Sequence, residues 1–203
     1  MSGLTHIAGG LLAGSAITYY AAISGNTPNV PVTGFFLTGC MSGAIICDTD
    51  EPKSLIGQVL LPFALLLRIL HWTFRILALP LPQRSILKRN LTDASYAFAH
   101  RGLMHWPTTL LIFTIGLSTI AFQITGHVAS AEVATVINNT IYGVCIGMFS
   151  HLLYDALSGT LPLLAPFSRK RFGLRLVESN GFIDKYIVRT LSIISSIYLL
   201  ISI

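Results

Sequence analysis

Long apolar segments separated by short polar breaks divide the chain into five candidate membrane spans. A helix needs about 20 mostly apolar residues to cross a hydrocarbon core of about 30 Å. The segments that meet this requirement are 4–24, 31–47, 104–125, 136–160 and 186–203. Turn-forming residues at 25–29 and a polar break at 125–130 separate neighbouring spans. The pattern predicts an all-α, polytopic membrane helical bundle of about five transmembrane helices, folded as one domain over residues 1–203.

A further apolar segment, residues 55–82, carries polar side chains in its middle. Arg68, His71 and Arg75 are spaced i, i+3, i+7, so in a helix they share one face. Two arginines at the centre of a bilayer would each cost about 2.5–3.5 kcal/mol even on a lenient insertion scale. We therefore predict an interfacial amphipathic helix over 55–82. The alternative is a sixth span whose arginine side chains extend to the membrane surface.

The position of this helix decides which polar segments share a side of the membrane. If it lies flat, the segments 48–54 and 83–103 face one compartment, and the opposite loops hold only His127 and Glu132. The basic residues that then share this compartment are Lys53, Arg68, Arg75, Arg84, Lys88, Arg89, Arg101, Arg169, Lys170, Arg171, Arg175, Lys185 and Arg189. Because cytoplasmic loops are enriched in Lys and Arg, this side is predicted to be cytoplasmic, with the N-terminus inside and the C-terminus outside.

Composition supports the membrane assignment. Of the 203 residues, 53% are hydrophobic and 10% are charged, which leaves too little polar surface for a water-soluble domain. The net charge of +5 reflects topology, and without a basic tract interleaved with aromatic residues no nucleic-acid partner is expected. Cys40, Cys47 and Cys145 lie scattered in apolar segments, so they are predicted to be small buried side chains.

Histidines and aspartates fall at the helix ends that face the predicted cytoplasm. The residues at these ends are His6, Asp48, Asp50, His100, Arg101, His105, His151 and Asp155. His151 and Asp155 are spaced i, i+4 and share a helix face, while Asp48 and Asp50 flank a threonine before Pro52. Each pair alone is as well explained by a structural His–Asp contact or by helix capping. Together they predict one polar site.

The spacing of His100 and His105 requires a break before the third span. On one continuous helix the two rings would point about 140° apart. Gly102 and Pro107 favour a helix that starts near Met104 or His105, because proline is tolerated in a first helical turn. His100 would then lie on a loop and could fold back towards His105.

This donor set is typical of a metal site. We expect His6, Asp48, Asp50, His100, His105, His151 and Asp155 to supply ligands, with some of them one shell further out. Imidazole and carboxylate donors without thiolate suit zinc, manganese or iron, in one copy or two. A metal lowers the pKa of bound water to about 7. Arg101 suits an anionic group of a substrate, and Asp50 is the expected general base.

The motifs resemble a known family, the bacterial membrane-bound metal-dependent hydrolases of the YdjM type, described as LexA-regulated inner-membrane proteins. The resemblance runs over most of the chain, and the segments that carry it are Thr5-His6, 48–54, 100–105, 150–155, Pro162–Pro166 and Arg169–Phe172. It implies the inner membrane of a bacterial cell. This chain departs from the family pattern at Glu51 and at the two neighbours of His105. The order of His and Asp is also similar to zinc-dependent phospholipase C and P1 nuclease, which implies phosphoester hydrolysis.

These observations favour a metal-dependent hydrolase that acts on an anionic phosphoester or a lipid headgroup at the cytoplasmic membrane face. One alternative is a proton or cation transporter, which would need ionisable groups at several depths. Another is a scaffold with a structural metal. Membrane lipids are expected partners, with the basic run 169–175 contacting anionic lipid, and the sequence leaves the oligomeric state open.

Overall fold

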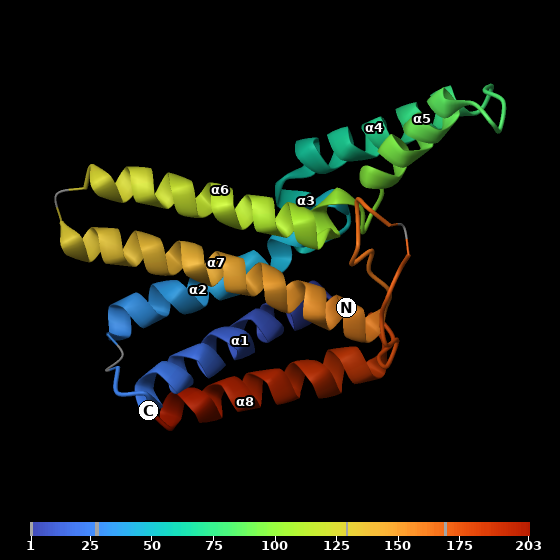
Figure 1. Ribbon diagram of the computed structural model, residues 1–203. Helices are drawn as coiled ribbons and strands as arrows, with labels where there is room; N and C mark the ends of the chain where they lie inside the picture. Colours follow the sequence, from blue (N-terminus) through green and yellow to red (C-terminus); the bar gives the residue numbers. More distant parts are fainter. Residues whose placement is uncertain (1, 27–28, 129, 169) are drawn as a thin grey trace.

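The protein is a bundle of long helices with a smaller helical hairpin at one end (Figure 1). The computed structural model describes residues 2–26, 29–128, 130–168 and 170–203. Its helices are α1 (Gly3–Ile23), α2 (Val30–Ile46), α3 (Leu55–Val59), α4 (Leu61–Ala78), α5 (Ile86–Ala97), α6 (Pro107–Gly126), α7 (Ala131–Ser158) and α8 (Arg189–Ile201). The described ranges contain no strand, only an isolated bridge between Leu161 and Phe172. The all-α prediction is confirmed.

Five helices are long and apolar enough to cross a membrane. They are α1, residues 31–50, α4, α6 and α7. Four of these agree with predicted spans. The predicted span 186–203 corresponds to α8, which has 13 residues and is not among these five. Helix α8 follows directly on a π-helical segment, Ile183–Val188. Together these two pieces form one rod that packs along α1 (Figure 1).

Close contact between α2 and α7 forms the centre of the bundle. Glycines repeat at i, i+4 on both helices, at Gly39 and Gly43 and at Gly143 and Gly147. A Cβ atom at any of the four would overlap backbone of the facing helix, for example the carbonyl oxygen of Val144 at Gly43. Small residues at this spacing let membrane helices approach closely. The two backbones therefore lie in direct contact just before the polar segments at their ends.

The segment 55–82 differs from the single helix expected there. It is broken at Leu60 into α3 and α4, because Pro62 lacks an N–H group and begins a new helix. The polar region that follows also contains α5, which the hydrophobic pattern did not show. His71 Nδ1 donates to the Ser95 carbonyl oxygen over 2.8 Å, so this residue of the polar face of α4 packs against α5, while Arg68 and Arg75 stay exposed.

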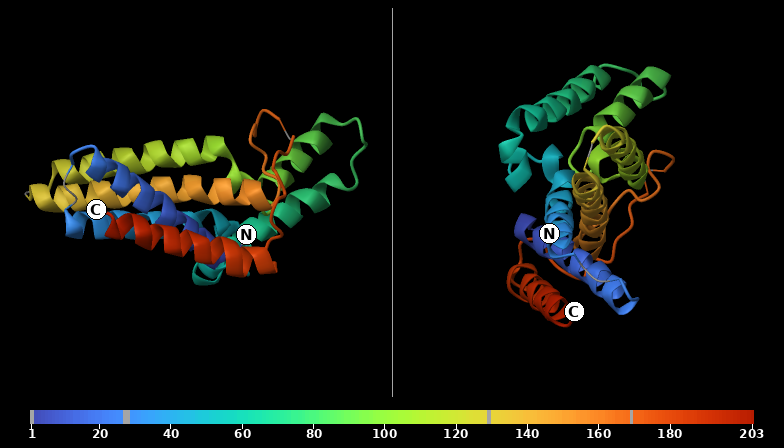
Figure 2. Two further views of the ribbon diagram at one scale, coloured as in Figure 1. Left: turned by 90° about the horizontal axis from the view of Figure 1, so that it is seen from below. Right: turned by 90° about the vertical axis from the view of Figure 1, so that its left-hand side faces the viewer.

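The hairpin of α4 and α5 extends obliquely past the end of the bundle (Figure 2). It leaves after α2 and returns before α6, so it starts and ends at the same end of the bundle. The opposite face of α4 exposes large apolar side chains, including Leu66, Ile69 and Ile76. This exposed apolar face suits the predicted position of α4 in the membrane interface. That position itself stays a prediction.

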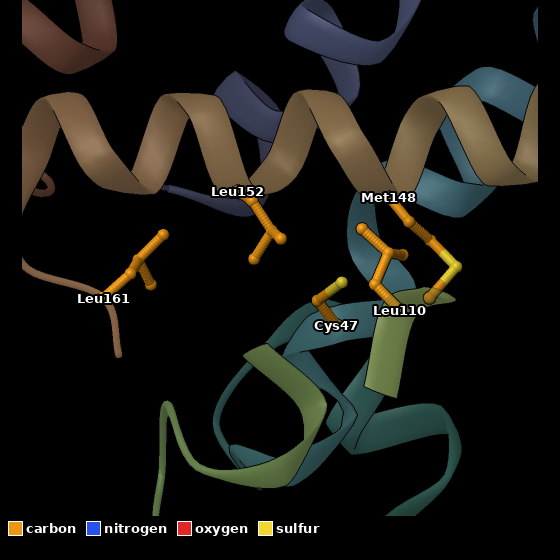
Figure 3. Close-up of a cluster of buried hydrophobic side chains, with 5 residues drawn as sticks. All are labelled: Cys47, Leu110, Met148, Leu152 and Leu161. Carbon is orange, nitrogen blue, oxygen red and sulfur yellow. The ribbon is translucent and has the colours of Figure 1, made fainter. Parts of the chain in front are cut away.

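A small apolar cluster lies next to the polar helix ends. Its members are Cys47, Leu110, Met148, Leu152 and Leu161, contributed by the 3₁₀ turn after α2, by α6, by α7 and by the segment after α7 (Figure 3). Cys47 directly precedes Asp48, and Leu152 directly follows His151. All three cysteines are free and buried, as the sequence predicts. The polar site is therefore bounded by apolar packing on its bundle side.

Candidate metal centre

The structure brings all eight predicted site residues to one end of the bundle. They come from the first turns of α1, the 3₁₀ turn Cys47–Asp50 after α2, the turn at 100–105 and the last turns of α7. The helix expected to start near Met104 or His105 starts at Pro107, after a 3₁₀ turn at Leu103–His105. This turn carries His105 inward and leaves His100 on the loop.

Four donor atoms converge at the centre of the site. His105 Nε2 lies 3.2 Å from His151 Nε2, 3.7 Å from Asp48 Oδ1 and 3.5 Å from Asp155 Oδ2. His151 Nε2 lies 3.6 and 3.8 Å from the same two oxygens. Ligand atoms held about 2.0–2.2 Å from a zinc ion in a tetrahedron are about 3.3–3.6 Å apart. The donor atoms of Asp48, His105 and His151 form a candidate ligand group, all within 4.8 Å of one another, and Asp155 Oδ2 approaches the nitrogens of both histidines.

The orientation of His151 is fixed from behind. Its Nδ1 donates to the Ala44 carbonyl oxygen over 2.6 Å, and its ring is fully buried. Because Nδ1 carries the proton in this bond, the Nε2 lone pair points into the site. Ala44 follows Gly43, so the close approach of α2 and α7 places this carbonyl within reach of the ring. Helix packing thereby prepares a ligand atom.

The two carboxylate oxygens of Asp155 make different contacts. Oδ2 faces the two histidines, while Oδ1 lies 3.1 Å from Arg101 Nη2 and 3.4 Å from His6 Nε2. The His6 ring stacks on His151 with a centroid separation of 3.8 Å. His6 also forms a candidate ligand group with His151 and Asp155, since these donor atoms lie within 4.8 Å of one another.

Asp50 and His100 lie one layer outside the converging atoms. Asp50 Oδ1 is 3.2 Å from His100 Nδ1, and Asp50 Oδ2 is 3.4 Å from His105 Nδ1. Asp50 Oδ2 also accepts the Arg101 backbone N–H over 3.2 Å. A carboxylate on the far nitrogen of an imidazole is the usual support of a metal-binding histidine. These contacts place Asp50 beside the far nitrogen of His105.

The protonation of His105 reflects the charge gathered around it. Burial alone would lower the pKa of its imidazole, but the carboxylates of Asp48, Asp50 and Asp155 raise that pKa to about 9. The site thus concentrates negative charge and favours a positive partner. A divalent cation is such a partner, and carboxylate with imidazole is a donor set suited to zinc, manganese or iron.

Arg101 is held in an unusual backbone conformation. Its φ angle is +57°, in the left-handed region that non-glycine residues seldom adopt. Its backbone N–H binds Asp50, and its guanidinium reaches Asp155 and passes over Gly159, where a Cβ atom would overlap it. Strained backbone of this kind is found where surrounding contacts hold a residue in a functional position.

An open cleft of about 610 Å³ leads to the converging atoms. Asp48, His100, Arg101 and Asp155 line it from the predicted site. Its wall also includes three cations that the sequence analysis counted only for topology: Lys53, Lys185 and Arg189. Lys53 lies three positions after Asp50, so local spacing could have linked it to the site, whereas Lys185 and Arg189 lie far along the chain from every predicted site residue. Arg169, part of the predicted lipid-contacting run, lies outside the described residues.

Asp184 is a second feature that the sequence analysis missed. Its side chain is fully buried, and Oδ2 accepts the backbone N–H groups of Ser2 and Asn180, each over 2.9 Å. Arg189 Nη2 donates to Ser2 Oγ over 2.9 Å. These bonds fasten the segment before α8 to the start of α1, and so set the position of His6. Asp184 lies just before the predicted span 186–203, so the hydrophobic pattern gave no signal for it.

Comparison with known proteins identifies the family of this chain but no individual relative. A search of curated proteins found no match, and neither did a search of solved structures. The similarity to zinc-dependent phospholipase C and P1 nuclease therefore stays a prediction. The model of the YdjM inner membrane protein family matches residues 1–202. With its apolar helices and a match over nearly its whole length, the chain belongs to the YdjM inner membrane protein family.

Proposed function

We propose that the protein is a metal-dependent hydrolase that acts on a phosphoester at the cytoplasmic face of the membrane. The observation that carries this proposal is the approach of Asp48 Oδ1 and Asp155 Oδ2 to both His105 Nε2 and His151 Nε2, at 3.5 to 3.8 Å. A cleft lined by Arg101 opens directly onto these atoms. The bundle end that holds the site also carries the basic residues, which supports a cytoplasmic orientation.

Each residue has a distinct part in this proposal. Asp48, His105, His151 and Asp155 would hold the metal, most simply zinc. When bound, the metal would supply hydroxide at neutral pH and polarise the phosphoryl oxygen. Arg101 would bind the anionic group and stabilise charge that develops on it. His6 would hold Asp155 in place through Oδ1, and Asp50 would hold His105 through Nδ1.

Two carboxylates, Asp50 and Asp48, are candidates for the general base. Asp50 as base stays a prediction, and both of its oxygens face protein groups. Asp48 is 14% exposed and lines the cleft, so it is the carboxylate best placed to meet an attacking water. Asp48 would therefore combine ligation with water orientation.

One ion is the simpler occupancy. The two candidate ligand groups, Asp48 with His105 and His151 and His6 with His151 and Asp155, share His151. Because His151 Nδ1 is bonded to the Ala44 carbonyl oxygen, only its Nε2 is available to a metal, and one nitrogen serves one ion. A transporter is less well supported, because no acid, base or histidine stands between the site end of α1, α2, α6 and α7 and their far ends.

The test is metal analysis joined to a substrate screen. Protein purified without chelator is expected to retain about one zinc, manganese or iron ion per chain and to hydrolyse phosphoesters. His151→Ala and Asp155→Ala should lose both metal and activity, whereas His127→Ala, at the far end of the bundle, should keep both. Full metal occupancy in His151→Ala would refute the ligand assignment. Stoichiometric metal with no hydrolysis of any phosphoester would favour the scaffold with a structural metal.

A further inference from the structure

The cleft carries more positive charge than its own carboxylates neutralise. Its charged lining residues are Asp48, Glu51, Lys53, Arg101, Asp155, Lys185 and Arg189. Arg101 pairs with Asp155 at 3.1 Å. Among the described residues, no carboxylate lies within ion-pairing distance of Lys53, Lys185 or Arg189. Three cations on one wall thus have no acidic partner there.

Arg189 is the most constrained of these cations. It is only partly exposed, and Nη2 is fixed by its bond to Ser2 Oγ. Its Nε is buried and makes no hydrogen bond to any described residue. A partly buried guanidinium with an unused donor is expected to bind an anion, and the planar fork matches phosphate oxygens. This arrangement points to an anionic ligand that spans the cleft from Arg101 to Arg189.

Two exposed leucines also line the cleft. Leu4 and Leu55 line it and are 53% and 49% exposed. The π-helical segment, which contacts α1, exposes Ile183 and Ile187 at 47% and 43% as well. This end of the bundle therefore carries exposed apolar side chains on both α1 and the π-helical segment. A water-soluble ligand would gain nothing from these side chains, whereas hydrocarbon chains would bury against them.

We propose that the cleft binds an anionic phospholipid, with its phosphate between Arg101 and the cations Lys185 and Arg189 and its acyl chains passing over Leu4 and Leu55 into the bilayer. This inference rests on the proposed function for its chemistry, because it names the phosphoester that would reach the metal. Lys53 would add to the positive potential at the mouth of the cleft. A free phosphate ester would share the anionic contacts but not the contacts with the two leucines.

Binding can be measured separately from hydrolysis. The full-length protein in phosphatidylcholine nanodiscs is treated with EDTA and titrated with dihexanoyl phosphatidic acid, glycerol 3-phosphate and dihexanoyl phosphatidylcholine. Phosphatidic acid is expected to bind most tightly. Arg189→Gln and Lys185→Gln should each weaken its binding about tenfold, as expected for loss of one charge-assisted hydrogen bond. Arg84→Gln, at an exposed residue that does not line the cleft, is the matched control.

A second pair of variants addresses the acyl chains. Leu4→Ser and Leu55→Ser should weaken binding of the short-chain phosphatidic acid but leave glycerol 3-phosphate unchanged. Equal affinity for both ligands in the unaltered protein would overturn the lipid assignment and leave a site for free phosphate esters. Absence of phosphatidic acid binding, or binding that Arg189→Gln and Lys185→Gln do not alter, would overturn the inference altogether.

Zinc added back to the same samples separates the two proposals. If lipid binds in EDTA but zinc neither binds nor permits hydrolysis, the lipid site stands and the hydrolase fails. If zinc binds and water-soluble phosphoesters are hydrolysed while phosphatidic acid is ignored, the hydrolase stands and the lipid site fails. Arg189→Gln should retain zinc in full, because it touches none of the four converging donors, so its effect on lipid cannot arise from metal loss.

Discussion

Asp50 Oδ1 lies 3.2 Å from His100 Nδ1 although 50 residues of chain separate them. The intervening segment contains α3, α4 and α5, and α4 alone is long and apolar enough to cross a membrane. Since both ends of this segment meet at the site, it leaves and returns at the same end of the bundle. The contact between Asp50 and His100 therefore depends on the path of this segment, because the turn after α2 can meet the turn before α6 only if the segment returns.

The return of this segment predicts a labelling pattern. Single cysteines at Lys53→Cys and at Gln83→Cys, which lies between α4 and α5, should react with an impermeant thiol reagent from the same side of the membrane. Glu132→Cys, at the start of α7, should react from the opposite side. The native cysteines are buried and should remain silent. Labelling of Gln83→Cys from the side of Glu132→Cys would show that α4 crosses the membrane.

The outer position of Asp50 predicts a graded loss of metal affinity. Asp50→Asn should weaken metal binding about 10–100-fold, because His105 loses the carboxylate that orients its far nitrogen. His100→Ala should have a smaller effect, since His100 is 44% exposed and its polar contact is with Asp50. Competition with a chelator of known affinity measures both. A complete loss in Asp50→Asn, equal to that in His151→Ala, would instead make Asp50 a direct ligand.

Arg101 is expected to act on substrate more than on metal. Arg101→Lys keeps the charge but loses the planar fork that reaches Asp155 from a left-handed backbone. We expect kcat/KM for a phosphoester to fall about 100-fold, the usual cost of one lost donor to a developing anion, with metal content unchanged. Arg171→Lys, an exposed residue bonded to the Thr160 carbonyl, serves as control. Metal loss in Arg101→Lys would assign it a structural part.

The contact between α2 and α7 predicts opposite effects for two glycines on α2. Gly43→Ala should destabilise the protein by about 1–3 kcal/mol, because the new methyl group overlaps the Val144 carbonyl and forces the helices apart. Gly34→Ala meets open space and should be neutral or stabilising by up to about 1 kcal/mol, as expected for alanine in a helix. Thermal unfolding in detergent compares the two.

The same glycine should affect the site from a distance. If Gly43→Ala separates the helices, the Ala44 carbonyl moves away from His151 Nδ1 and the ring loses its fixed orientation. Metal affinity should then fall together with stability. An unfolding temperature equal to that of Gly34→Ala would mean that the close helix contact does not support the fold.

Much of the fold follows from local pattern in the sequence. Hydrophobic length predicts α1, α2, α6 and α7 because the bilayer requires about 20 apolar residues for each crossing. Helix α5 escaped notice because its stability comes from packing against α4, which a scan for apolar segments does not detect. The break at Leu60 was signalled by Pro62, yet the continuous apolar composition concealed it.

The site was likewise predictable in part: local spacing identified residue pairs, but only the folded structure shows which atoms meet. Residue type and spacing identified His151 with Asp155 and Asp48 with Asp50, because chemistry at i, i+4 or i, i+2 is set by the local backbone. Which atoms converge depends on side-chain rotation and helix packing. Spacing therefore could not separate the four central donors from His6, Asp50 and His100, which contact those donors from outside.

By itself the sequence determined that this is a membrane bundle whose acids, histidines and cations fall at the ends of its helices. Those properties depend on hydrophobic length and charge, which are read along the chain. Only the tertiary structure decided that the segment between Asp50 and His100 returns to its starting level, that Asp50 lies beside His105, and that Lys185 and Arg189 share a cleft with Arg101. These relationships join residues 50 or more positions apart, and only the packing of helices against one another fixes such distances.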